Sequence, residues 1–174
     1  MTVPLFVCHA NCCRSVLARY LYQDLCNAPA LSAGLDVGER INDRAEGMLR
    51  KWGVDASAHR PMKLSRDLCE EADAIFVMGP SYLHRLVWEY GEDLADKAYL
   101  FADPFTRPES FANGEYKVSD PSFDSRRTSE LVKEFGWMRE RVVQIRLALL
   151  GDGRPLVPLS EYLGLCKAVD RWSH

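Results

Sequence analysis

Short apolar runs alternate with longer segments of helical periodicity along most of the chain. Four runs are short, apolar and close to turn-forming residues, as buried strands are: residues 3–7, 30–34, 73–78 and 98–101. Longer segments repeat apolar residues every three or four positions and predict helices: residues 15–25, 42–52, 82–90 and 125–150, with a shorter helix over 64–71. Because strands and helices alternate, we predict an α/β fold, a single domain with a central parallel four-stranded sheet and helices on both faces.

Local signals mark the ends of several elements. Asn42 or Asp43 is expected to cap the helix that follows, and Gly53 to stop it. The connector over residues 102–123 is long and contains several prolines, but its aromatic side chains argue against disorder. We expect the main domain to comprise residues 1–150. Residues 151–174 are expected to form a C-terminal appendage that carries a short helix and packs on the same domain.

The composition is that of a folded protein with a small net negative charge. Of the 174 residues, 47% are hydrophobic and 27% are charged, and the formal net charge is −3. This charge gives no electrostatic case for nucleic acid or an acidic membrane as a partner. No apolar run approaches the ~20 residues that a membrane span needs, and the first residues lack the basic start of an export signal.

We therefore expect a cytoplasmic protein in which the six cysteines are reduced thiols. Cys26, Cys69 and Cys166 are expected to be small buried hydrophobic residues. The sequence leaves the oligomeric state open.

The most informative stretch joins the first strand to the first helix, and it consists of Cys8, His9, Ala10, Asn11, Cys12, Cys13, Arg14 and Ser15. A tight loop from a strand into a helix N-terminus points several backbone N–H groups at one place, and the helix dipole favours an anion there. The same field can hold Cys8 as a thiolate. Arg14 can grip two oxygens of a tetrahedral oxyanion. We interpret the stretch as a phosphate-binding loop with a nucleophile at its floor.

Several residues of this loop have alternative roles. Ser15 can donate a hydrogen bond to a Cys8 thiolate or can cap the helix. Asn11 can hold the loop through side-chain to backbone hydrogen bonds, since asparagine tolerates unusual backbone angles, or it is a plain turn residue. A metal site is another alternative, because His9 lies among three thiols. Ligands on one tight loop cannot easily surround an ion, however, and no distant cysteine pair has ligand spacing, so we expect no metal and no cofactor.

The loop resembles the signature of the low-molecular-weight protein tyrosine phosphatases. In that family the motif runs cysteine, any residue, glycine, asparagine, any residue, cysteine, arginine, serine. Further segments resemble the family in the same order along the chain: Ser32-Ala33-Gly34, Asp43-Arg44-Ala45, Asp73 to Met78, and Asp120-Pro121. The resemblance covers residues 3–150, so it implies a low-molecular-weight phosphatase-like domain over most of the chain.

This resemblance implies an enzyme that hydrolyses phosphotyrosine and other aryl phosphate monoesters, with a phosphoprotein or a small aryl phosphate as substrate. Cys8 would attack the phosphorus to give a phosphocysteine intermediate, while Arg14 and the N–H groups of residues 9–15 hold the phosphate oxygens. Asp120 would protonate the leaving oxygen and then accept a proton from water. Cys13 matches the family's second loop cysteine, which implies a reversible Cys8–Cys13 disulfide, whereas Cys12 has no counterpart.

Two aspartates and two phenylalanines compete for the remaining roles. Asp103 and Asp120 both precede a proline, and the position of Asp120 just before the last long helix favours it as the acid, as in the family. Asp103 is then a turn residue. Phe123 and Phe105 are candidates for the aromatic wall around a phosphotyrosine ring, or they pack in the core. His59, His84 and His174 receive no role.

The chain also departs from the family pattern. Ala10 replaces glycine, which would be strained if the position needs a positive φ. Residues 35–38 lack the aromatic or histidine side chain that often lines the substrate entrance, and Ser122 stands where a tyrosine is usual. These departures bear on the preference for tyrosine more than on the phosphatase chemistry.

Other activities use the same scaffold. A thioredoxin-coupled arsenate reductase needs further relay cysteines, commonly near residues 76–79, where this chain has none. A phosphoarginine phosphatase would be recognised by comparing its rates on phosphotyrosine and on phosphoarginine. A non-catalytic phosphate-binding module would tolerate the loss of Cys8.

Overall fold

Four parallel strands form one sheet with the order β2-β1-β3-β4. The computed structural model describes residues 2–108 and 116–163. Its strands are β1 (Pro4–Cys8), β2 (Leu31–Gly34), β3 (Ala74–Val77) and β4 (Ala98–Leu100). The register places Val7 of β1 between Ala33 of β2 and Val77 of β3. The predicted parallel four-stranded sheet is therefore confirmed.

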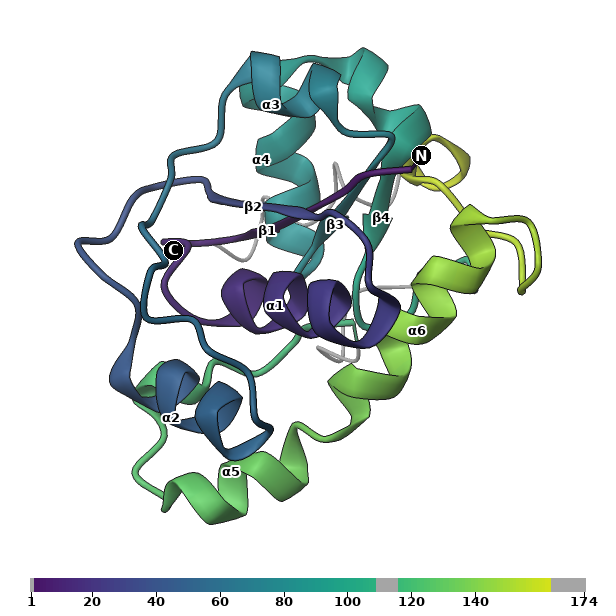
Figure 1. Cartoon of the computed structure of the whole chain (residues 1–174). Coiled ribbons are helices and arrows are strands. Elements are labelled where there is room, and N and C mark those ends of the chain that lie inside the picture. Colours follow the sequence, from purple (N-terminus) through teal and green to yellow (C-terminus); the bar gives the residue numbers. More distant parts are fainter. Residues whose placement is uncertain (1, 109–115, 164–174) are drawn as a thin grey trace.

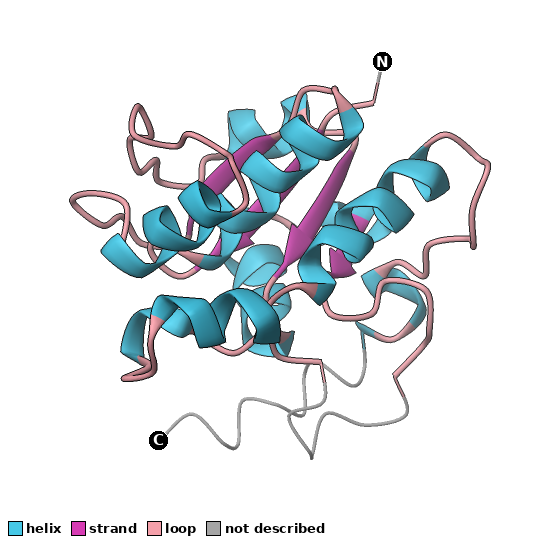
Figure 2. Cartoon of the chain, turned by 60° about the horizontal axis from the view of Figure 1, so that its bottom comes forward, coloured by secondary structure: helices cyan, strands magenta, loops and turns pink. Residues whose placement is uncertain are grey.

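Helices cover both faces of this sheet (Figure 2). They are α1 (Arg14–Cys26), α2 (Asp43–Lys51), α3 (Arg66–Glu71), α4 (Pro80–Tyr90), α5 (Thr128–Glu134) and α6 (Trp137–Leu149), with short 3-10 helices η1 (Glu92–Lys97), η2 (Pro121–Phe123) and η3 (Leu159–Glu161). Figure 1 shows α1 and α6 on one side of the strands and α3 and α4 on the other. The layered α/β arrangement follows from strands that are apolar on both faces.

The core divides along the alternation of side chains in the strands. Phe6 and Phe76 belong to a cluster with residues of α1, α2, α5 and α6. Leu5, Val7 and Ile75 belong to a second cluster that includes residues of α4 and η1. Successive side chains of a strand point to opposite faces, so β1 and β3 supply both clusters at once. All five of these side chains are fully buried.

The predicted boundaries of α2 are confirmed. Asn42 is its N-cap, and the side chain accepts a hydrogen bond of 3.0 Å from the N–H of Arg44. Gly53 follows the helix with φ +82°, a left-handed conformation that glycine adopts without strain.

The prediction of one long helix over residues 125–150 is wrong, because the chain turns at Phe135 and Gly136. The N–H of Phe135 still bonds to the carbonyl of Leu131, but Gly136 and Met138 bond only three residues back, which tightens the helix and redirects it. Figure 1 shows α5 alongside α2, and α6 rising beside α1. The turn lets Leu131 and Met138 both be buried against the same core.

The described part of the C-terminal segment contacts the main body of the protein. Leu159 and Tyr162 are buried in the cluster that includes α4, and the N–H of Val157 donates to the carbonyl of Pro104 at 2.8 Å. The rest of the expected appendage, with Cys166 and His174, lies outside the described residues. Of the helices in the described ranges, none combines the length and apolar character needed to cross a bilayer.

Candidate active site

The loop predicted to bind an anion follows β1 at the carboxyl edge of the sheet. β1 ends at Cys8 and α1 begins at Arg14, and Figure 1 shows the purple chain turning from one element into the other. The chain connects β1 to β2 on one side and later places β3 on the other. Such a switch in strand order opens a crevice at the carboxyl ends, where α/β proteins bind ligands.

The segment after β2 runs alongside this loop. The N–H groups of residues 35, 36 and 38 donate to the carbonyls of Cys8, His9 and Ala10 at 3.1, 2.9 and 2.9 Å. Gly34 lies so close that a Cβ there would be 2.7 Å from the Asn11 nitrogen. The glycine at the end of β2 is therefore needed for the loop to pack against this strand.

A cavity of about 80 Å³ lies over the loop. Residues from two distant parts of the chain line it: Cys8, His9, Ala10, Cys12, Cys13 and Arg14 from the loop, and Asp120, Ser122 and Phe123 from the connector. The structure thus brings together the three predicted catalytic residues. Two of the predicted phosphate-binding residues, Asn11 and Ser15, do not line the cavity and lie behind the loop instead.

Asn11 holds the loop from behind. It is fully buried with φ 53°, and its Oδ1 accepts a hydrogen bond of 2.9 Å from the N–H of Met62. Its backbone carbonyl faces Nε2 of the buried His59 at 2.9 Å. The prediction that Asn11 fixes the loop through side-chain to backbone bonding at an unusual backbone angle is confirmed.

The amide of Asn11 also orients the hydroxyl next to Cys8. Because the Met62 N–H can only donate, Oδ1 must face it, so Nδ2 points to Ser15 Oγ at 3.0 Å. Ser15 accepts that bond, which leaves its own proton for Cys8 Sγ, 3.0 Å away. The alternative that Ser15 caps the helix is wrong, because Cys13 is the N-cap and no side chain caps α1.

Arg14 is nearly buried, and its guanidinium is held at both ends. NH1 donates to the carbonyl of Val118 at 3.2 Å, and NH2 donates to Tyr82 Oη at 3.0 Å. NH2 also lies 2.7 Å from Asp120 Oδ2. Burial acts to lower the pKa of Arg14, but Tyr82, Asp120 and Cys8 more than offset it and raise that pKa. Nε of Arg14 is buried with no partner among the described residues, so this donor of the guanidinium is not committed to another group.

Asp120 and Asp103 occupy different environments. Asp120 lines the cavity and its Oδ1 accepts from the N–H and hydroxyl of Ser122. Asp103 Oδ1 accepts from the N–H of Phe105 at 3.0 Å, which is the bonding of a turn residue. Phe105 is buried, with the guanidinium groups of two arginines over its ring. Only Asp120 of these two aspartates faces the loop.

Phe123 differs from Phe105 because it is 90% exposed and lies at the cavity. An apolar ring so open to water, beside a small cavity, is placed to cover an aromatic group that enters it.

The other two thiols of the loop are unsuited to act as nucleophiles. Burial, with the charges of Asp120 and Cys8, raises the pKa of Cys13 well above its usual range. Burial and Cys8 also raise the pKa of Cys12, whose Sγ donates to the carbonyl of Ala10 at 3.2 Å. The described cysteines are all free, and the Cys8–Cys13 disulfide stays a prediction. Ala10 is not among the described residues with positive φ, so its replacement of glycine causes no strain.

The sequence missed several residues that support the site. Tyr82 holds Arg14 from the first turn of α4, and His59, which received no role, supports Asn11. Burial lowers the pKa of His59, in keeping with a neutral ring that donates through Nε2. At the cavity rim, Asp36 lies 3.4 Å from Nδ1 of His9 and 3.2 Å from NH1 of Arg85. No local signal marks these residues, because each contact joins positions far apart in the sequence.

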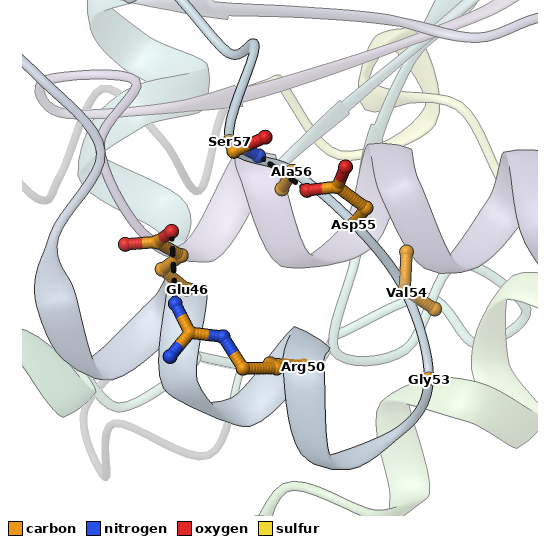
Figure 3. Close-up of a pocket in the computed structure, with 7 residues that line it drawn as sticks. All are labelled: Glu46, Arg50, Gly53, Val54, Asp55, Ala56 and Ser57. Carbon is orange, nitrogen blue, oxygen red and sulfur yellow. Dashed lines mark hydrogen bonds and ion pairs between the residues drawn. The ribbon is translucent and has the colours of Figure 1, made fainter.

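A larger cavity of about 340 Å³ lies elsewhere, between the end of α2 and the loop that follows it (Figure 3). Its polar side chains are paired with their neighbours: Arg50 with Glu46 at 3.1 Å, and Asp55 with the N–H of Ser57 at 2.9 Å. Its lining contains no cysteine, and its arginine is already paired with a carboxylate.

Comparison with known proteins identifies the family. "Low molecular weight protein-tyrosine-phosphatase Ptp" of Acinetobacter johnsonii is 38% identical over 79 residues, 42% of this chain and 54% of that protein. The chain thus spans about half the length of this curated relative. "Probable low molecular weight protein-tyrosine-phosphatase AmsI" of Erwinia amylovora is 30% identical over 131 residues, 74% of this chain and 85% of that protein.

A solved structure shares the fold. YwlE arginine phosphatase from Geobacillus stearothermophilus matches with a TM-score of 0.73 and 19% identity, over 87% of this chain and 95% of that one. Residues 4–145 match the family profile described as "Low molecular weight phosphotyrosine protein phosphatase". Because this match covers more than half of the chain, the chain belongs to the low molecular weight phosphotyrosine protein phosphatase family.

Proposed function

We propose that this protein is a phosphatase that hydrolyses phosphotyrosine and other aryl phosphate monoesters through a phosphocysteine intermediate. The observation that carries the proposal is the convergence of Cys8, Arg14 and Asp120 on one small cavity, together with membership of the family. Ser15, oriented by Asn11, supplies a hydrogen bond that favours a negatively charged sulfur at Cys8.

In the first step the Cys8 sulfur attacks phosphorus and the bond from phosphorus to the aryl oxygen breaks. The proton on the Asp120 carboxyl moves to the departing oxygen, which leaves as a phenol. In the second step a water attacks the phosphocysteine, Asp120 takes one of its protons, and the sulfur–phosphorus bond breaks to release phosphate. Arg14 and the backbone N–H groups of residues 9–15 hold the phosphate oxygens through both steps.

The ion pair between Arg14 and Asp120 sets the order of events. The Asp120 carboxylate is paired with NH2 of Arg14, a nitrogen that the phosphate would also bind. The substrate must therefore displace Asp120 from this nitrogen. Asp120, once released from Arg14, can turn toward the leaving oxygen.

The cavity supports an aryl substrate, because the exposed ring of Phe123 stands at its edge. A phosphoarginine substrate is the second candidate, since YwlE arginine phosphatase shares the fold. An arsenate reductase that relays through Cys69 is disfavoured. Cys69 is fully buried in the cluster with α4, on the sheet face away from α1, and burial raises its pKa to about 11.

We also infer that the protein acts in the cytoplasm, on a phosphoprotein or a small aryl phosphate, without a metal or other cofactor. Residues 1–150 would be the phosphatase domain and 151–174 an appendage on it. The burial of Leu159 and Tyr162 in a core cluster of the main domain supports the packing of this appendage on it.

The test is hydrolysis of aryl phosphates with leaving groups of graded acidity. Cys8→Ser should abolish turnover of p-nitrophenyl phosphate and still bind inorganic phosphate. Asp120→Ala should lower turnover strongly for phenyl phosphate and weakly for p-nitrophenyl phosphate, because a good leaving group needs little protonation. Asp103→Ala serves as the matched control, because Asp103 also precedes a proline but does not face the loop. An equal loss on both substrates would contradict the acid role, and a faster rate on phosphoarginine than on phosphotyrosine would select the second candidate.

A further inference from the structure

Tyr82 contacts the Arg14 guanidinium in two independent ways. Its hydroxyl accepts a hydrogen bond of 3.0 Å from NH2, and the centre of its ring lies 5.4 Å from the guanidinium carbon. Both contacts therefore connect two helices, because Tyr82 lies in the first turn of α4 and Arg14 is the first residue of α1. The tyrosine of α4 thus holds a buried cation that belongs to α1, the helix on the other side of the sheet (Figure 1).

The position of Tyr82 follows from the carboxyl edge of the sheet. α4 begins at Pro80, directly after β3, which lies beside β1. The N–H of Tyr82 bonds to the carbonyl of Gly79 at 3.1 Å, and the side chain packs against both core clusters. Tyr82 is therefore anchored in the fold, unlike a mobile surface side chain.

Tyr82 is bonded to NH2 of Arg14, the nitrogen that contacts Asp120 in the structure and would contact the phosphate when the substrate binds. NH2 has two hydrogens: in the structure one faces Asp120 and the other faces Tyr82. When a phosphate replaces Asp120, NH2 keeps both bonds only if Tyr82 stays in place. NH1 remains tied to the carbonyl of Val118 through one of its two hydrogens, and the hydrogen of NH2 that faced Asp120 becomes available to the phosphate.

We propose that Tyr82 is a positioning residue, which fixes the Arg14 guanidinium in the cavity while the bound anion takes the place of Asp120. This inference rests on the proposed function for its catalytic consequence, but anion binding alone can test it. The role is specific to the hydroxyl, since the ring by itself would leave the second hydrogen of NH2 without an acceptor.

The experiment measures inorganic phosphate binding by calorimetry in the Cys8→Ser protein, which cannot turn over. Adding Tyr82→Phe should weaken phosphate binding by roughly 10- to 100-fold, the usual effect of losing one hydrogen bond to a charged group. Tyr82→Leu should weaken it by roughly two- to fivefold more, because the ring face is also lost. In the protein with Cys8 intact, kcat/KM for p-nitrophenyl phosphate should fall in the same order.

Tyr90→Phe is the matched control. It removes the same hydroxyl from the same helix, but that hydroxyl donates to the carbonyl of Leu64 at 3.3 Å. It should leave phosphate binding unchanged. The melting temperature of each variant, with and without phosphate, separates a lost anion contact from a weakened fold.

Two results would overturn the inference. One is a Tyr82→Phe protein that binds phosphate as tightly as its parent. The other is an equal loss of affinity in Tyr82→Phe and Tyr90→Phe, which would assign the effect to the helix. Failure of the unmutated protein to hydrolyse any aryl phosphate would instead refute the proposed function, and the calorimetry would still decide the role of Tyr82.

Discussion

Replacing Asn11 by alanine should destabilise the protein far more than an exposed asparagine replacement does. The change removes two hydrogen bonds, from the Met62 N–H at 2.9 Å and to Ser15 Oγ at 3.0 Å. It also forces alanine to adopt φ 53°. At about 1 kcal/mol for each hydrogen bond and about 1 kcal/mol for the left-handed backbone, the expected loss in unfolding free energy is roughly 3 kcal/mol.

Asn27 provides a matched control. It ends α1 with φ 45° and is exposed, so Asn27→Ala carries the backbone part of the effect, about 1 kcal/mol. Urea unfolding followed by the fluorescence of the four tryptophans would measure both variants. The difference of roughly 2 kcal/mol isolates the buried hydrogen bonds.

The two outcomes separate clearly. If Asn11→Ala costs no more than Asn27→Ala, the hydrogen bonds that define the back of the loop do not stabilise it, and the orientation argued for Ser15 fails with them. If the larger loss is found, Asn11→Ala should also lower turnover, because Ser15 is then free to turn away from Cys8.

Three further predictions concern other parts of the site. Asp120→Ala should bind phosphate several-fold more tightly than the parent in calorimetry, because the carboxylate that competes for Arg14 is gone. Weaker binding would contradict the displacement of Asp120 from Arg14 by phosphate. The pKa of His59 is lowered from 6.5 by burial, so the unfolded state binds a proton that the folded state does not, and the unfolding free energy should fall as pH drops below 6.5. His59→Gln should flatten that dependence in melting curves between about pH 5 and 7.5, and an unchanged slope would refute the assignment. Gly34→Ala should abolish phosphate binding, since its Cβ would meet loop backbone at 2.7 Å, whereas Gly53→Ala, which has open space, should retain it.

The sequence was sufficient for the elements whose information is local. Three strands are short runs of apolar residues, and β2 contains one buried serine. A run that is buried on both faces needs no knowledge of its neighbours to be recognised. Asn42 and Gly53 mark the ends of α2 because capping depends on residues within one turn. The chemistry of Cys8 and Arg14 was also readable, since both lie within one loop between a strand and a helix.

The turn at Gly136 could not be predicted in this way. Apolar residues continue at helical spacing on both sides of it, so the pattern alone indicates one helix. The turn is decided by which surfaces are available to pack against, α2 for α5 and α1 for α6.

The sequence by itself therefore determined the strands and the loop with its cysteine and arginine, because these depend on neighbouring residues and on backbone geometry. Only the tertiary structure decided which aspartate faces the loop, which face of the sheet holds Cys69, and which side chains hold Arg14 and Asn11. Those contacts join segments that are distant along the chain, and a hydrogen bond between distant segments is specified by the packing of the whole core. The partners of a buried cation are thus a property of the fold, even when the cation itself is plain in the sequence.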